Sequence, residues 1–150
     1  MSEDSKLVIT RIFDAPRPVV FQAFTDPDQL AQWFAPVGMS VPRETVDVDN
    51  RVGGHQRFTM VNDSDPEHRM PVSAVFTEFV ENEVIAGEED ITDNADVPGD
   101  RLLMRIEFFD EADDRTRIVL TQGPFTQQWR DGANEGWTSS FTKLDKILSR

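Results

Sequence analysis

The C-terminal segment places the strongest constraint on how this 150-residue chain can fold. After Gly123-Pro124, apolar or small residues recur with the period of about 3.6 that one face of an α-helix produces. They are Phe125, Trp129, Ala133, Gly136, Trp137, Ser140, Phe141, Leu144, Ile147 and Leu148. The pattern predicts one long helix from about Thr126, its N-cap, to Leu148. Such a helix has to bury its apolar stripe against another element.

Short strand-like runs separated by turn residues fill the middle of the chain. They lie near residues 42–48, 55–62, 70–80, 83–91, 101–110 and 115–121, which predicts consecutive antiparallel hairpins. The clearest alternation sets Leu102, Met104, Ile106 and Phe108 against Leu103, Arg105, Glu107 and Phe109. One face is strongly apolar and the other mixed, so we expect a sheet buried on one side.

The N-terminal part is predicted to form one strand and two short helices. Residues 6–13 are rich in Val, Ile and Phe and end at Asp14-Ala15-Pro16, which stops a strand. Pro16 and Pro18 suit a first helical turn, and Asp26-Pro27 supplies an N-cap for a helix with Leu30, Trp33 and Phe34. The layout is α+β, with the last helix covering the sheet. No repeat or linker divides it, so we expect one domain over residues 1–150.

Charge excludes several classes of partner. Lys and Arg number 15 against 28 Asp and Glu, and the net charge of −13 opposes binding to nucleic acid or to an anionic membrane. The densest acidic stretch, Glu88 to Asp100, is predicted to be a solvated loop. The acidic start and the lack of an apolar run near ~20 residues favour a soluble, cytoplasmic protein.

No recognisable catalytic or metal-binding set is present in the sequence. There is no cysteine, and the two histidines, His55 and His68, are thirteen residues apart. No G-x-S-x-G motif occurs, and Gly53-Gly54 is interpreted as the start of a strand or a bulge. We therefore expect no metal, no cofactor and no catalytic residue, and a binding protein is favoured over an enzyme.

Glu78 is the one carboxylate that the sequence singles out, since it lies between Phe76, Phe79 and Val80. It is either a general acid or ligand anchor facing a cavity, or a surface or paired charge, and the second interpretation is favoured. Arg57 and Arg105 are its candidate partners. The alternation of residues along each strand does not by itself say whether these side chains lie on the same face of the sheet.

Several motifs, in order and over nearly the whole chain, carry a family resemblance. They are Arg11-Ile12-Phe13-Asp14-Ala15-Pro16, Val20-Phe21-Gln22-Ala23-Phe24-Thr25-Asp26-Pro27, Leu30-Ala31-Gln32-Trp33-Phe34-Ala35-Pro36, Gly53-Gly54-His55-Gln56-Arg57-Phe58-Thr59-Met60, Phe76-Thr77-Glu78-Phe79 and Glu135-Gly136-Trp137-Thr138-Ser139-Ser140-Phe141-Thr142-Lys143-Leu144. The chain resembles the Hsp90-ATPase-activator-homologue family. It departs from the family at Trp33-Phe34, where many relatives carry two tryptophans, and at Ser73-Ala74, where a glycine is usual.

The resemblance implies the helix-grip fold of the START and Bet v 1 (SRPBCC) superfamily, a curved antiparallel sheet around a long C-terminal helix. Members commonly enclose a cavity between the two. The candidate ligand-binding residues are Trp33, Phe34, Phe58, Met60, Phe76, Glu78, Met104, Ile106, Trp129, Trp137 and Phe141. Whether the aromatic ones form core or cavity wall stays open, but Trp137 and Phe141, one turn apart, are expected to face the sheet together.

Three functions from different classes follow. The first is binding of a hydrophobic small molecule that is lipid-like, aromatic or polyketide-like. The second is interaction with a chaperone, which the family name implies, and the third is an enzyme of the cyclase or hydrolase kind. A fully packed interior would weaken the first, a large exposed apolar patch would favour the second, and a buried unpaired acid would favour the third.

Overall fold

The computed structural model describes residues 6–90 and 101–148. Its strands are β1 (Leu7–Phe13), β2 (Met39–Ser40), β3 (Asp47–Val48), β4 (His55–Asn62), β5 (Asp65–Val80), β6 (Val84–Asp90), β7 (Arg101–Glu111) and β8 (Arg115–Gly123). Its helices are α1 (Arg17–Thr25), α2 (Pro27–Trp33), the 3-10 helix η2 (Arg43–Thr45) and α3 (Gln127–Leu148). The prediction of an α+β chain with two short helices after the first strand and one long helix at the end is confirmed.

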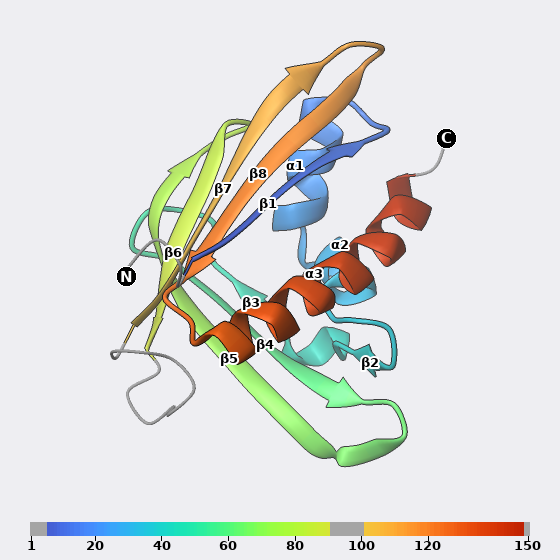
Figure 1. Cartoon of the computed structure of the whole chain (residues 1–150), viewed down its shortest axis with the longest axis vertical. Coiled ribbons are helices and arrows are strands. Elements are labelled where there is room, and N and C mark those ends of the chain that lie inside the picture. The colour runs from blue at the N-terminus through green and yellow to red at the C-terminus, as the bar shows by residue number, and fades with distance from the viewer. Residues whose placement is uncertain (1–5, 91–100, 149–150) are drawn as a thin grey trace.

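The strands form one bent antiparallel sheet that wraps around α3. Their order is β1-β8-β7-β6-β5-β4-β2, and β3 also pairs with β4. Figure 1 shows two arms of the sheet diverging, one formed by β1, β7 and β8 and the other by β4 and β5, with α3 running between them. Both short helices lie on the same side of the sheet as α3 (Figure 1). This is the expected helix-grip arrangement.

Residues 40–48 differ from the expectation, because the strand predicted over 42–48 is wrong for most of its length. Pro42 has no N–H to donate to a ladder, and it precedes η2 instead. Within η2 the Thr45 hydroxyl donates to the Pro42 carbonyl at 2.7 Å and accepts the Thr59 N–H of β4 at 3.2 Å. The Thr45 side chain thus takes the place of a backbone hydrogen-bond partner for β4. Of this stretch, only the two-residue strands β2 and β3, before and after η2, pair with β4. Over residues 6–90 and 101–148 the sheet therefore has eight strands, one more than the seven strand-like runs of the sequence.

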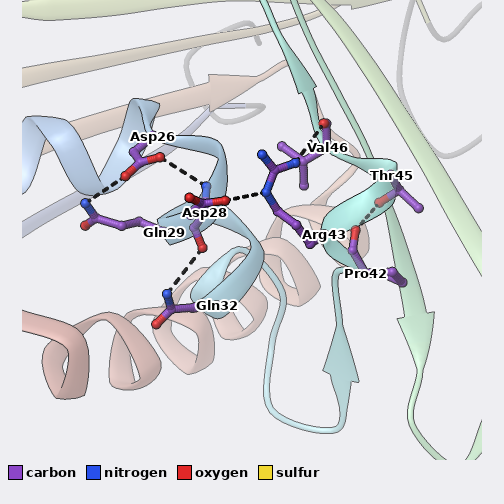
Figure 2. A network of polar contacts seen from close by, with 8 residues as sticks. All are labelled: Asp26, Asp28, Gln29, Gln32, Pro42, Arg43, Thr45 and Val46. Atoms are coloured by element: carbon purple, nitrogen blue, oxygen red, sulfur yellow. Dashed lines mark hydrogen bonds and ion pairs between the residues drawn. The ribbon is translucent and has the colours of Figure 1, made fainter.

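A polar network ties α2 to η2 (Figure 2). The Asp26 carboxylate caps α2 by accepting the Asp28 N–H at 3.1 Å, as the Asp-Pro pair predicted, and it also accepts from Gln29 Nε2 at 3.2 Å. Arg43 Nε of η2 donates to Asp28 Oδ1 at 2.6 Å. The network holds the outer side of α2, so that Leu30 and Trp33 on its inner side stay buried.

The core lies where α1, α2 and the second half of α3 meet the sheet. Trp33 is fully buried, its ring contacts Phe24 and Phe34, and its Nε1–H donates to the Ala23 carbonyl at 2.8 Å. Phe141 of α3 is also fully buried and contacts the Phe13 ring edge-on at 5.3 Å. An indole that is buried with its N–H satisfied adds apolar area without an unpaired polar group.

A bulge in β5 changes which face its residues occupy. Phe76 pairs with Gly87 but Glu78 pairs with Ala86, so Thr77 is the extra residue. Because of it, Phe76 and Phe79 both face inward, with ring centroids 5.4 Å apart, and Glu78 faces outward. Gly87 is required opposite the bulge, since a Cβ there would lie 2.9 Å from the Val75 carbonyl oxygen.

The α3 helix begins and ends close to the predicted limits. The Trp129 N–H donates to Thr126 Oγ1 at 3.3 Å, which confirms Thr126 as the N-cap. Gly53 and Gly54 lead directly into β4 and exchange backbone hydrogen bonds with Phe76 at 2.9 Å. None of the helices in residues 6–90 and 101–148 is long and apolar enough to cross a membrane.

Candidate ligand-binding cavity

A cavity of about 610 Å³ separates the concave face of the sheet from the first half of α3. Its floor contains Phe58 and Met60 of β4, Phe76 of β5 and Met104 and Ile106 of β7. These residues face inward because each is at an inward position of the period-two alternation of its strand. This part of the floor is therefore apolar.

The roof of the cavity is a helix face made mostly of small residues. Gly132, Ala133, Gly136 and Ser140 of α3 line it together with Trp137. A Cβ at Gly132 or at Gly136 would meet no atom within 4 Å. Neither glycine therefore contributes a side chain to the space beside it.

The cavity is open to solvent at one end. Met70 of β5 and Trp129 of α3 both line it, and they are 41% and 38% exposed. These two exposed apolar side chains therefore belong to the part of the wall that solvent reaches.

Aromatic rings close the other end. The Phe34 ring lies 5.0 Å from the Phe58 ring and 5.6 Å from the Trp137 ring, in edge-to-face contacts. The Trp137 Nε1–H donates to Gln122 Oε1 of β8 at 2.8 Å. This bond fixes the indole in the wall with its polar group satisfied.

Most of the side chains predicted from the sequence lie in this wall. They are Phe34, Phe58, Met60, Phe76, Met104, Ile106, Trp129 and Trp137. Trp33 and Phe141 instead belong to the core beside the cavity, where Phe13, Phe34 and Trp137 surround them. Phe141 follows Trp137 by one turn, but at its depth α3 already touches the sheet, so no space is left for it to line.

Glu78 lies outside the cavity. Its carboxylate pairs with the Arg105 guanidinium on the outer face of the sheet, and its side chain is 42% exposed. Arg57, the other candidate partner, lies 3.7 Å from Asp47. The alternative of a paired surface charge is therefore confirmed, and the bulge at Thr77 is the reason, because it turns Glu78 away from the face that Phe76 occupies.

Glu89 is the carboxylate that the sequence reasoning missed. It lines the cavity on β6, where it pairs with Ala74 of β5 and Leu102 of β7. Burial raises the pKa of its carboxyl group above the usual value, because desolvation disfavours the charged form. The strand predicted near 83–91 is confirmed as β6, so the prediction of a solvated loop from Glu88 onward is wrong for residues 88–90. Residues 91–100 lie outside the described residues.

A signal for Glu89 was present in the alternation of its strand. Ile85, Gly87 and Glu89 are opposite Ile106, Met104 and Leu102, the apolar face that the sequence did identify. The strand predicted near 83–91 already includes Glu89, and its period-two alternation places Glu89 on that face. The acidic composition of the following residues favoured a loop instead.

The histidines lie apart from the cavity wall. His55 Nε2 lies 3.1 Å from Asp47 Oδ2, and His68 is exposed on β5. Within the described part of the chain, no three His, Asp or Glu side chains gather closely enough to hold a metal ion.

Comparison with known proteins identifies the same fold. The family model described as "Activator of Hsp90 ATPase homolog 1-like protein" matches residues 14–149. Comparison with curated proteins found no match.

Solved structures from several bacteria are similar over nearly the whole chain. A protein from Nitrosomonas europaea is 23% identical, with a TM-score of 0.81 over 99% of this chain and 96% of that chain. A protein from Chromobacterium violaceum is 22% identical, with a TM-score of 0.82 over 97% and 98%. The AHSA1 protein from Silicibacter pomeroyi is 26% identical, with a TM-score of 0.79 over 96% and 97%.

Proposed function

The chain belongs to the family of Activator of Hsp90 ATPase homolog 1-like proteins, within the START/SRPBCC superfamily, and from that premise we propose that it binds a hydrophobic small molecule between the sheet and α3. The observation that carries the proposal is the cavity of about 610 Å³ with an apolar floor. Small-molecule sites usually enclose about 300–1,000 Å³ and are lined mainly by apolar and aromatic side chains. We also propose that residues 1–150 act as one domain.

The roof supports the proposal independently. Natural cores are packed without large voids, so a partly buried helix glycine such as Gly136, which borders unfilled space, needs a reason. Gly132 and Gly136 each forgo the better helix propensity of a larger residue. A ligand that fills the space restores the missing contacts and accounts for both positions.

The test fills the cavity from the roof with Gly136→Leu. The uncharged dye N-phenyl-1-naphthylamine, whose emission rises in apolar surroundings, is titrated into the wild-type protein and the variant. We expect saturable binding to the wild type and a weakening of at least about tenfold, or about 1.4 kcal/mol, in the variant. Thr138→Leu places the same side chain on an exposed position of α3 outside the cavity wall and is the matched control.

Two outcomes count against the proposal. One is a wild-type protein that gives no saturable signal with this dye or with a panel of aromatic and fatty compounds. The other is equal binding by Gly136→Leu and Thr138→Leu, which would place the dye elsewhere on the molecule. Thermal unfolding of both variants shows that each remains folded.

An enzyme is the second candidate, and Glu89 is the observation that favours it. A partly buried acid with a raised pKa is suited to general acid catalysis. The described lining residues offer it no histidine or lysine as a second catalytic group, so binding is the better supported function. A chaperone is the alternative partner that the family description suggests. On the outer sheet face, the exposed apolar residues Leu103 and Val75 lie beside the Glu88–Arg101 ion pair.

A further inference from the structure

The charges of the cavity wall have one sign. Glu88 and Glu89 line the cavity, and among the described lining residues none is a lysine, arginine or histidine. The net charge of −13 adds a field that attracts cations over a longer range. A carboxylate or phosphate on the ligand would find no counter-charge in this wall.

The two glutamates face opposite sides of the sheet. Glu88 pairs in register with Val75 and Leu103, both exposed, and its carboxylate binds the Arg101 guanidinium. Glu89 pairs with Ala74 and Leu102, which both line the cavity. No ion pair to another described residue engages Glu89, so its charge is available to a molecule inside the cavity.

A second acceptor lies in the same row of the sheet. Gln56 of β4 pairs with Ala74 of β5, which in turn pairs with Glu89 of β6. Gln56 is only 8% exposed and lines the cavity. Its amide oxygen and the Glu89 carboxylate are separated by the short methyl group of Ala74, so both can reach a single donor group placed over that residue.

We propose that the ligand of this cavity is a lipophilic amine whose ammonium group binds Glu89 and Gln56 while its apolar part occupies the space under Gly136. This inference rests on the proposed function and names the chemistry of the ligand. An ammonium group has three N–H donors and no acceptor, which suits a carboxylate and an amide oxygen.

The reduced hydration of the Glu89 carboxylate favours an amine over other head groups. Burial raises the pKa of Glu89, which means that its charged form lacks part of the water it would have in solution. A bound cation compensates that charge, whereas an alcohol supplies a weaker neutral donor and a fatty acid adds a second negative charge. Charge-assisted hydrogen bonds are about twice as strong as neutral ones, so the head group should dominate selectivity.

The test compares three ligands with one apolar chain and different head groups. Decylamine, decanol and decanoate are used to displace N-phenyl-1-naphthylamine at about pH 8, where the amine is protonated and carboxylates are ionised. We expect the amine to bind at least about tenfold more tightly than the alcohol, and decanoate to bind more weakly than both. Glu89→Gln should reduce the advantage of the amine to threefold or less.

Glu78→Gln is the matched control. It removes one negative charge from the same sheet, on the outer face, and should leave the preference for the amine unchanged. Gly136→Leu should abolish binding of all three compounds. This result would distinguish binding inside the cavity from adsorption of a cation to the acidic surface.

The outcomes distinguish this inference from the proposed function. If decylamine and decanol compete equally well, or if Glu89→Gln keeps the preference for the amine, the inference fails and binding of an apolar molecule stands. If decanoate binds most tightly, the inference also fails. If none of the compounds displaces the dye and the dye itself does not bind, the proposed function fails first.

Discussion

The two halves of α3 follow the same helical pattern but have opposite surroundings. The second half carries Phe141, Leu144 and Leu148, which are buried against the sheet and the short helices. In the first half the corresponding positions carry Ala133 and Trp137, which line the cavity together with the neighbouring Gly136. Periodicity says which face of a helix turns inward, but the volume of the side chains on that face decides whether core or cavity results.

The two halves of α3 also contribute differently to stability and to ligand binding. Contacts in the second half hold α3 on the main core, while the first half borders the cavity. It is anchored there by the Trp137 bond to Gln122 and by packing of Ala133 and Trp137 on a small cluster around Phe125. Substitutions in the second half should therefore change the free energy of unfolding. Substitutions in the first half should change ligand binding instead.

The largest expected effect comes from truncating the second half. Phe141→Ala removes a fully buried ring that contacts Phe13 and Trp33, and it should lower the free energy of unfolding by about 3–5 kcal/mol. Trp129→Ala, an equally drastic truncation in the first half, should cost about 1 kcal/mol or less, because that indole is 38% exposed. Urea unfolding monitored by circular dichroism measures both. Equal losses would contradict the division of the helix.

A smaller effect of opposite sign is expected at the roof. Gly136→Ala places a methyl group where no atom lies within 4 Å, and it should raise the free energy of unfolding by about 0.5–1 kcal/mol through helix propensity. The same substitution at Gly87 should destabilise the protein, since its Cβ would lie 2.9 Å from the Val75 carbonyl oxygen. Thermal unfolding of the two variants checks the contrast. A loss of stability at Gly136 would mean that the roof is packed after all.

The smallest expected effect is a pH dependence from the acid in the cavity. The pKa of Glu89 is raised in the folded protein, so the folded state holds this proton more tightly than the unfolded chain does. Its contribution is therefore most favourable below the unfolded value of about 4.5 and is lost as pH rises through the folded pKa.

Glu89→Gln has no such titration. The variant should be slightly more stable than the wild type at neutral pH, and the difference should vanish in mild acid. Chemical denaturation of both proteins over a pH series measures it, and the other carboxylates cancel in the comparison. A variant that is less stable at neutral pH would show that Glu89 is held by a favourable partner.

The sequence predicted the architecture well because the architecture depends on patterns. The alternation in β7 and the stripe of α3 each record one buried face, and capping at Asp26 and Thr126 follows from local chemistry. The prediction of a strand over 42–48 was wrong because Pro42 cannot donate a backbone hydrogen bond and the Thr45 hydroxyl accepts one from β4 in place of a strand.

The site was predicted less completely because it depends on register. Glu78 is turned away from the cavity by one extra residue at Thr77, which has no sequence signature of its own. Glu89 lies within the strand predicted over 83–91, but the acidic residues that follow favoured a loop at its position. Phe141 and Trp137 lie on the same face of α3. The sequence does not show how close each turn of the helix lies to the sheet, and this distance decides that Phe141 is in the core and Trp137 in the cavity wall.

The unfilled space beside Gly132 and Gly136 has a consequence for adaptation. A single-nucleotide change leads from a glycine codon to alanine, and at neither position does an added Cβ meet an atom within 4 Å. The capacity of the cavity can therefore be reduced in small steps without disturbing the buried part of the same helix. Selection for a different guest molecule would have two independent sites at which to act while the scaffold stays intact.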